Sequence, residues 1–156
     1  MPPGAYQVVG GVPRRIYLKE ARWGDQDALS QDVVIEDHVA PLRLVFSTHT
    51  ASVTAIVEGP GAGSPTARVV LVPEESKRYQ KQYVRGPAKI DLRTGRFELR
   101  SLAPGRYQAI ALDPVTRDFN LSREFLRLHR DAVVDVQLSE DDHQVVTLPL
   151  VRWQEN

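Results

Sequence analysis

Cysteine is absent from this chain of 156 residues. Without a thiol, the chain can form no disulfide, supply no thiolate nucleophile and offer no sulfur ligand to a metal ion. Thiol-dependent catalysis and cysteine-ligated metal centres are therefore excluded. The same absence fits any cellular compartment and decides between none of them.

The chain also lacks an excess of charge and any long apolar run. Its twenty basic and twenty acidic residues cancel, so we expect no general binding to nucleic acid or to anionic membranes. No apolar run approaches the length of a membrane span. The first residues show neither the basic region nor the apolar region of a signal peptide. An apolar fraction of 42% still allows a packed core in one domain, or in one domain plus a fragment.

The most informative stretch spans residues 96–111. Phe97 and Leu99 alternate with charged residues, which is the period of a half-buried strand, and a second alternating strand follows. Between the two strands, Pro104 fixes its own φ and Gly105 accepts a positive φ, as a tight turn requires. We therefore expect two short strands joined by a turn, in the manner of a hairpin.

A second turn lies just upstream, where Asp91-Leu-Arg-Thr-Gly95 has the polar and glycine chemistry of a hairpin. The two turns and their strands form one motif, Asp91-x-x-x-Gly95-Arg-Phe97-x-Leu99 followed by Leu102-x-Pro104-Gly105-x-Tyr107. This motif resembles the signature of carboxypeptidase regulatory-like domains. The resemblance implies a small immunoglobulin-like or transthyretin-like β-sandwich, of a kind often found in tandem in secreted and cell-envelope proteins of bacteria. It implies an extracytoplasmic location but no particular activity, because such domains are attached to many unrelated proteins.

The beginning of the chain repeats part of this motif. Pro2-Pro-Gly-Ala-Tyr6 matches the segment that ends in Pro104-Gly-Arg-Tyr107, at an offset of 101 positions (104 minus 3). A second match, between segments ending at His38 and His143, follows in the same order at an offset of 105 (143 minus 38). We therefore expect a partial module over residues 1–47, equivalent to the C-terminal half, followed by a complete module.

The complete module is expected over residues 48–152. The partial module would leave strand edges and an apolar face uncovered, which water does not tolerate. We expect it to pack on the complete domain, to pair with a second chain in a homodimer, or to mark a boundary at which a longer protein was cut.

Alternation of apolar and polar residues predicts further strands. Their ranges are 15–23, 42–46, 53–57, 67–73, 132–138 and 146–150. Apolar residues at Leu121, Phe125 and Leu128 predict one short amphipathic helix, capped by Asn120 or Ser122. Pro149 implies an edge strand or a ladder hydrogen bond that is not made. The sequence thus predicts an all-β sandwich with one short helix.

Residues that would carry catalysis do not gather in recognisable patterns. None of the four histidines, His38, His49, His129 and His143, is followed three positions later by the glutamate of a zinc-binding His-x-x-Glu pair. No Gly-x-Ser-x-Gly elbow supports a serine nucleophile. The glycine-rich loop 59–65 lacks the Gly-Lys-Ser/Thr ending and the helix of a phosphate cradle. We expect no enzyme and no cofactor.

Two acidic clusters, Asp25-Gln-Asp27 and Glu140-Asp-Asp142, offer oxygen atoms that calcium would accept. Neither has the ligand series of an EF-hand loop, and carboxylates in short turns more often form and solubilise the turn. We expect no metal site.

The strongest binding candidate is the segment 77–85, which interleaves basic and aromatic residues. Tyrosine rings stack on sugars, and cations meet acidic partners. The candidate residues are Tyr79, Lys81, Tyr83 and Arg85, with Trp23 and Trp153 as further parts of a sugar platform. The alternative is that both tyrosines cover a sheet edge while the charges remain solvated.

Two functions follow from these observations. The first is a non-catalytic β-sandwich module of a bacterial extracytoplasmic multidomain protein, acting as a structural spacer or a protein-interaction domain. Its partners would be other proteins or neighbouring domains of the same polypeptide. The alternative is a carbohydrate-binding module that uses the aromatic residues of the 77–85 loop.

Overall fold

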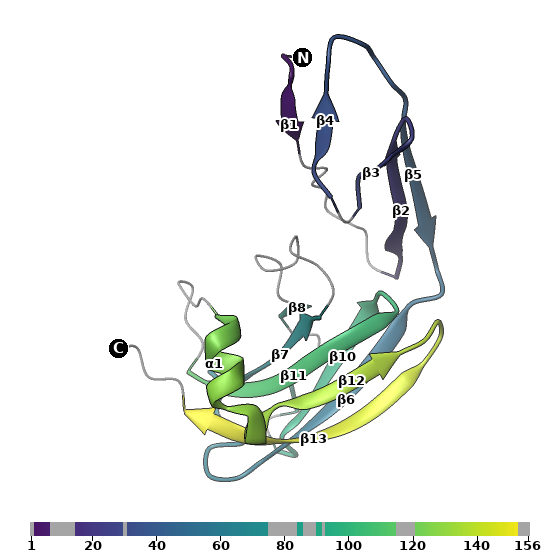
Figure 1. Cartoon of the computed structure of the whole chain (residues 1–156). Coiled ribbons are helices and arrows are strands. Elements are labelled where there is room, and N and C mark those ends of the chain that lie inside the picture. The colour runs from purple at the N-terminus through teal and green to yellow at the C-terminus, as the bar shows by residue number, and fades with distance from the viewer. Residues whose placement is uncertain are drawn as a thin grey trace.

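The protein is a two-part, strand-rich molecule (Figure 1). The computed structural model describes residues 2–6, 15–29, 31–74, 84–85, 90–91, 93–114 and 121–152. The N-terminal strands are β1 (Gly4–Tyr6), β2 (Tyr17–Trp23), β3 (Gln26–Asp27), β4 (Val33–Ile35) and β5 (Leu42–Ser47). Those that follow are β6 (Ala51–Glu58), β7 (Arg68–Pro73), β8 (Val84–Arg85), β9 (Ile90–Asp91), β10 (Arg96–Leu102), β11 (Gly105–Asp113), β12 (Val134–Leu138) and β13 (His143–Arg152). A helix, α1 (Arg123–Leu128), and a 3₁₀ turn over Arg130–Ala132 lie between β11 and β12.

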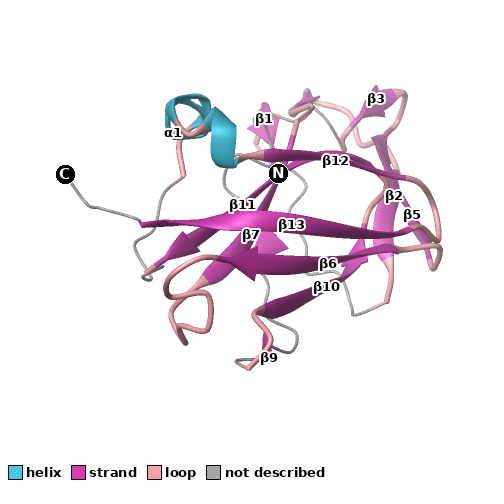
Figure 2. Cartoon of the chain, turned by 90° about the horizontal axis from the view of Figure 1, so that it is seen from below, coloured by secondary structure: helices cyan, strands magenta, loops and turns pink. Residues whose placement is uncertain are grey.

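The strands from β6 onward form a β-sandwich, so the predicted all-β fold is confirmed. Seven strands follow one another in the order β8-β7-β11-β13-β6-β10-β9, and β12 pairs with β11 off this path. Most neighbours are antiparallel, but β13 runs parallel to both β6 and β11. Figure 2 shows β6, β10 and β13 stacked below β11 and β12, with α1 at one side.

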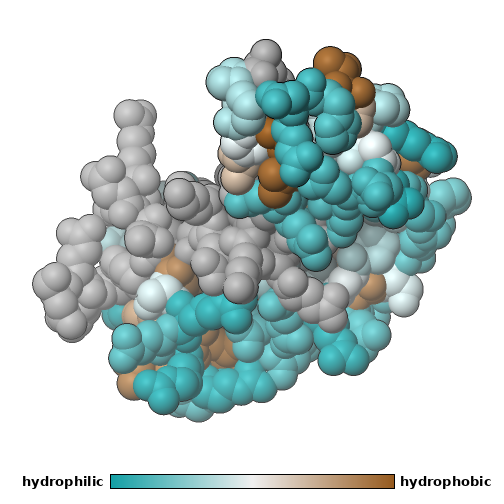
Figure 3. Space-filling view, turned by 45° about the horizontal axis from the view of Figure 1, so that its top comes forward, coloured by the Kyte–Doolittle hydropathy of each residue, from teal (hydrophilic) through white to brown (hydrophobic). Residues whose placement is uncertain are grey.

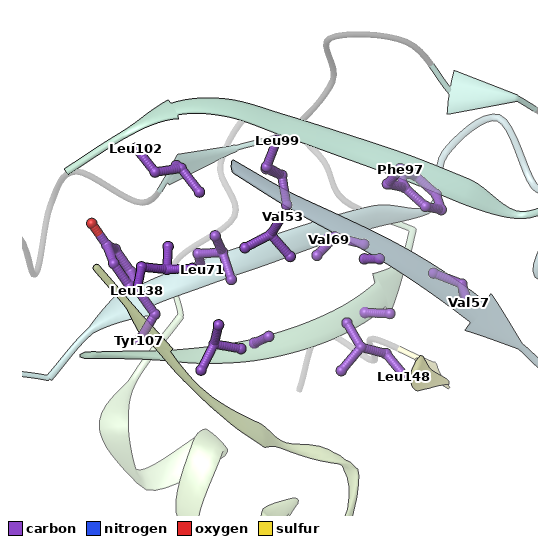
Figure 4. Packing of buried hydrophobic residues seen from close by; sticks show 14 of the residues in the cluster. Val53, Val57, Val69, Leu71, Phe97, Leu99, Leu102, Tyr107, Leu138 and Leu148 are labelled. Atoms are coloured by element: carbon purple, nitrogen blue, oxygen red, sulfur yellow. The ribbon is translucent and has the colours of Figure 1, made fainter. Parts of the chain in front are cut away.

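The core lies between the two layers of strands (Figure 4). In β6 every second residue from Ala51 to Val57 is buried, as the alternation of apolar residues predicts. Phe97, Leu99 and Leu102 of β10 reach the same cluster from the adjoining strand. They meet residues of β7, β11, β12 and β13, including Leu71, Tyr107, Leu138 and Leu148. Strands β6, β7 and β10 thus contribute much of the buried core of the sandwich.

Helix α1 covers the outer side of β7 and β11. Val70 and Ile110 point away from the main core and pack with Leu121 and Leu126. This second covering explains why β7 and β11 read as nearly continuous apolar runs. The predicted helix and the Ser122 cap are confirmed, since the Ser122 hydroxyl accepts a hydrogen bond from the Phe125 amide at 3.0 Å.

The expected packing face of the helix was wrong in one position. Leu128 is 69% exposed, whereas Leu126 is buried. Leu128 follows Leu126 by two residues, which is about 200° around the helix, so its side chain lies on the side opposite the buried one. The other proposed cap, Asn120, lies outside the described residues.

The strands β10 and β11 do not form a hairpin, in contrast to the expectation from residues 96–111. β10 pairs with β6 and β9, whereas β11 pairs with β7, β12 and β13. The turn at Pro104 therefore carries the chain from one layer to the other. The Tyr107 hydroxyl spans this corner and donates a hydrogen bond to the Ala103 carbonyl at 2.6 Å.

The upstream turn at Asp91–Gly95 is a hairpin turn, as predicted. Arg96 lies opposite Asp91 in the antiparallel β9–β10 pair. Gly95 has a φ of +66°, and a Cβ atom there would lie 2.9 Å from the Val57 carbonyl oxygen. Only glycine fits this position without displacing the backbone.

Pro149 occupies a point at which β13 changes partners. The parallel ladder with β6 ends at the pair Pro149–Glu58, and the ladder with β11 begins at Leu150. The strand is therefore not at an edge. The missing amide of proline falls at the exchange between two ladders.

Asp113 at the end of β11 is a buried carboxylate. Its Oδ1 atom accepts hydrogen bonds from Ser64 Oγ at 3.1 Å and from Thr66 Oγ1 at 2.5 Å. Arg152 lies 3.6 Å from the other carboxylate oxygen. The Asp113 carboxylate thus ties the glycine-rich loop after β6 to the sandwich.

The N-terminal strands form two small sheets above the sandwich (Figure 1). β1 and β4 form a two-stranded ribbon, and β3, β2 and β5 form a three-stranded sheet in that order. Ala21, Ala28 and Val33 make a small buried cluster between them. The side chain of Gln26 joins the sheets, because its amide both donates to the Val34 carbonyl and accepts from the Val34 amide.

Candidate interaction surface

The ribbon β1–β4 has the same strand pairing as β11–β12 in the sandwich. Tyr6 lies opposite Val33, and Tyr107 lies opposite Val136. Two residues earlier on each strand, a glycine pairs with Ile35 or Leu138, respectively. The segments whose sequence matches suggested a repeat thus form strand pairs, β1–β4 and β11–β12, with the same antiparallel register.

The two tyrosines also make the same hydrogen bond. Tyr6 donates to the Pro2 carbonyl and Tyr107 to the Ala103 carbonyl, each at 2.6 Å and each four residues back. Between the paired strands, however, the two parts differ. The N-terminal segment carries the β2–β3 hairpin where the sandwich carries α1.

The N-terminal segment exposes one side of β5. Leu42, Leu44 and Phe46 point to the same face and are 46%, 41% and 46% exposed. Their cross-strand neighbours on β2 include Ala21, which is fully buried, and Trp23, which is half-buried. The β2 half of this face is therefore covered and the β5 half is open. Figure 3 shows hydrophobic patches reaching the surface of this upper part of the molecule.

The open face contrasts with its counterpart in the sandwich. In β13, Leu148 is fully buried, and Val146 and Leu150 pack against the main core. β5 follows β4 along the chain as β13 follows β12. Both β5 and β13 carry apolar residues at every other position. β5 can thus bury the same kind of face, but none of the described residues covers it.

Polar contacts join the N-terminal segment to the sandwich. Glu140, in the turn between β12 and β13, accepts hydrogen bonds from the Tyr17 hydroxyl at 3.1 Å and from Lys19 Nζ at 3.3 Å. The hydrogen bond from Tyr17, which has the largest effect, and the one from Lys19 hold the pKa of the Glu140 carboxyl below its ordinary value of 4.5. The charged carboxylate is therefore the form that supports the junction.

Further contacts lie beside this junction. The Arg15 amide donates to the Ser101 hydroxyl at 2.9 Å. Ser101 has a φ of +60° at an irregularity in the β6–β10 ladder. Within the connection between the two parts, His49 Nδ1 lies 2.8 Å from Asp141 Oδ2. Contacts from β2, its preceding turn and the β5–β6 link thus converge on one end of the sandwich.

Most of the candidate sugar-binding residues fall outside the described part of the chain. These are Tyr79, Lys81, Tyr83 and Trp153. The backbone of Arg85 belongs to β8, where it pairs with Val70 of β7. Trp23 ends β2 and packs against the Ala21–Val33 cluster, so the ring is half-buried there. Trp23 thus takes part in packing.

The acidic clusters make turns and ion pairs. Asp27 Oδ1 accepts from the Leu29 amide at 2.8 Å, as in an Asx turn. Asp142 accepts from Gln144 and from the Ser139 and His143 amides, and these bonds lower the pKa of the Asp142 carboxyl. Among the described residues, no three histidine or acidic side chains are grouped to hold a metal ion.

One pair of reactive side chains was not predicted from the sequence. Ser52 Oγ lies 2.6 Å from His143 Nδ1 across the parallel β6–β13 ladder. The other ring nitrogen faces the Thr54 hydroxyl at 3.3 Å. A catalytic histidine of the serine-hydrolase type has a carboxylate at that second nitrogen. Because parallel pairing of strands distant in sequence creates this contact, no local motif announces it.

Comparison with known proteins identifies no family for this chain. No protein-family model matches the sequence, and no curated protein matches it significantly. Among solved structures, the chain is similar to the Bacillus anthracis TIE protein, with a TM-score of 0.36 and 15% identity. The similarity covers 86% of this chain and 23% of that one, so this chain spans less than a quarter of that structure. A likeness of this size carries no argument about function. No helix among the described residues is long and apolar enough to cross a membrane.

Proposed function

We propose that the chain is a non-catalytic β-sandwich module of a bacterial extracytoplasmic multidomain protein, in which it acts as a structural spacer and protein-interaction unit. The observation that carries the proposal is the repeated pairing of β1–β4 and β11–β12, with the same register and the same tyrosine bond. Modules that repeat along a chain extend it and set the distance between its ends.

The resemblance to carboxypeptidase regulatory-like domains supports the extracytoplasmic location. It rests on the Asp91–Gly95 turn and on the Pro104-Gly105-x-Tyr107 passage, both of which have clear structural roles here. The turn holds the β9–β10 hairpin, and the tyrosine bridges the corner between layers. Both passages thus serve the fold of the sandwich.

A spacer must hold its neighbours in a fixed relative orientation, and the junction offers the means. Hydrogen bonds join the two parts beside their connection: Tyr17 and Lys19 donate to Glu140, and the Arg15 amide donates to Ser101. The bonds of Lys19 and Arg15 are exposed and each contributes little by itself, whereas the Tyr17 bond is partly buried. Several together restrict rotation about the linker over residues 48–50.

The absence of cysteine makes this orientation measurable. Spin labels at V39C and V145C would occupy two exposed positions, one in each part. We expect one narrow distance distribution by pulsed electron paramagnetic resonance. A control variant with Gly-Gly-Ser-Gly inserted after Thr48 should give a broad distribution. Equal widths for the two proteins would contradict the spacer role.

A further inference from the structure

The strand β5 combines an open apolar face with an open backbone edge. In the three-stranded sheet, β5 lies at the end of the order β3-β2-β5, so only one of its edges forms a ladder within the described residues. An edge strand presents backbone donors and acceptors that another strand can pair with. On β5 this edge borders Leu42, Leu44 and Phe46.

The sandwich shows how the equivalent strand is completed. There, β13 pairs along one edge with β6, in parallel, from His143–Ser52 to Pro149–Glu58. Val57 of β6 lies beside Leu148 of β13, and both side chains enter the core. The neighbour that β13 requires is thus a parallel strand with small apolar residues at alternate positions.

We propose that β5 binds a β-strand of a partner polypeptide, added in parallel at its free edge with the register that β6 has on β13. The partner strand would carry small apolar side chains at alternate positions, as β6 does at Ala51, Val53, Ala55 and Val57. These side chains would lie beside Leu42, Leu44 and Phe46. This inference deepens the proposed function, because it names what the interaction unit binds.

A second copy of this chain does not supply such a strand. Its own β6 is paired on both edges, with β10 and with β13. Two copies of β5 could pair edge to edge about a twofold axis. That arrangement would place the two apolar faces side by side and leave both in water, so it would join the edges without burying the faces.

The register can be stated residue by residue. The apolar triplet Leu42, Leu44 and Phe46 of β5 can be superposed on Val146, Leu148 and Leu150 of β13. This superposition aligns Leu44 with Leu148, an offset of 104 (148 minus 44), and aligns Arg43 with Thr147. Thr147 lies opposite Ile56 of β6. A partner strand with the sequence of β6 should therefore place its Ile56 position beside Arg43. The position of Ser52, four residues earlier, lies about 13 Å further along the strand.

Binding can be tested with a synthetic peptide of residues 49–60 and the full chain of 156 residues. A labelled peptide should bind the full chain in a fluorescence anisotropy titration. The control is the same peptide with V53S and V57S, which keeps the length and charge but loses the apolar face. L44E should weaken binding at least about tenfold, because it places a charge on the apolar face. V145E, at another exposed apolar position of the chain, is the matched control and should bind as the parent does.

Direction is tested by disulfide formation, for which the cysteine-free chain gives no background. R43C should cross-link to a peptide carrying I56C and should not cross-link to one carrying S52C, since only the first pair lies within disulfide reach. Circular dichroism checks that L44E and R43C remain folded. The proposal would be overturned if the two peptides bound equally, or if R43C cross-linked to the S52C peptide. It would also be overturned if the free chain formed a dimer that L44E abolishes. A narrow spin-label distance together with such a result would leave the spacer role in place and remove only the strand-binding role.

Discussion

Tyr6 and Tyr107 stand 101 positions apart (107 minus 6) and make the same hydrogen bond, each to the carbonyl four residues before it. Each also lies two residues after a glycine in an antiparallel strand pair, and the two pairs have equal register. Such a bond fixes the angle at which a strand enters its sheet, as tyrosine corners do in other β-sandwiches. The two parts of the chain therefore use the same local device at the same place.

The energetic role of the corner can be measured with Tyr107→Phe. The variant keeps the buried ring and removes only the hydroxyl donor to Ala103. We expect the free energy of unfolding of the sandwich to fall by about 1 kcal/mol, the usual contribution of one such bond. Urea denaturation gives this value. Tyr6→Phe is the matched control and should leave the main transition unchanged, because Tyr6 lies outside the sandwich core. A loss of equal size in both variants would contradict this separation.

Leu148 and Leu44 offer a second comparison, between equivalent positions of which one is buried and one is open. Leu148→Ala removes a fully buried side chain and should cost about 2–5 kcal/mol of unfolding free energy. Leu44→Ala removes a side chain that is 41% exposed and should cost less than about 1.5 kcal/mol. Denaturant titrations of both variants measure the difference. A cost at Leu44 as large as that at Leu148 would show that the β5 face is covered in solution.

The positions of the strands could be predicted from the sequence because burial on one face imposes a period of two. β6 and β12 follow this rule closely, whereas β7 is covered on both faces and has a continuous apolar run instead. The pairing of strands could not be predicted in the same way. β10 and β11 adjoin in sequence but belong to different layers, because the corner at Pro104 is as short as a hairpin turn.

The candidate site was less accessible to sequence reasoning. Alternation in β5 predicted an apolar face but could not say whether other strands cover it, since coverage depends on contacts between distant segments. The junction bonds of Glu140 and the Ser52–His143 contact are also long-range and leave no local pattern. The β2–β5 pairing places Trp23 beside Leu42 and the small N-terminal cluster, and its part in a binding platform stays a prediction.

The junction should loosen in acid. Because the pKa of Glu140 is lower in the folded protein, its contribution to the junction is present above the ordinary value of 4.5 and is lost as the pH falls through the lowered folded value. The distance distribution between labels at V39C and V145C should broaden over this range. Glu140→Gln should be broader at neutral pH and show less change with pH. A distribution that stays narrow in acid for the parent chain would contradict a role for this carboxylate.

Carbohydrate binding provides a further test, because it was the alternative function. We expect a glycan array to show no specific binding by the full chain. The variant with Tyr79→Ala and Tyr83→Ala separates the outcomes if binding occurs. Specific binding that this variant loses would replace the interaction-module account with a carbohydrate-binding one.

The central claim is that a complete module follows an incomplete one, and unfolding of residues 48–156 tests it most directly. The fragment keeps β6 to β13 and hence all residues of the main core and of the cluster under α1. We predict a cooperative thermal transition within about 5 °C of that of the full chain, since few polar contacts join the two parts and most of them are exposed. A fragment that fails to fold, with no cooperative transition and no near-ultraviolet circular dichroism signal, would show that the two parts form one domain and would contradict the account.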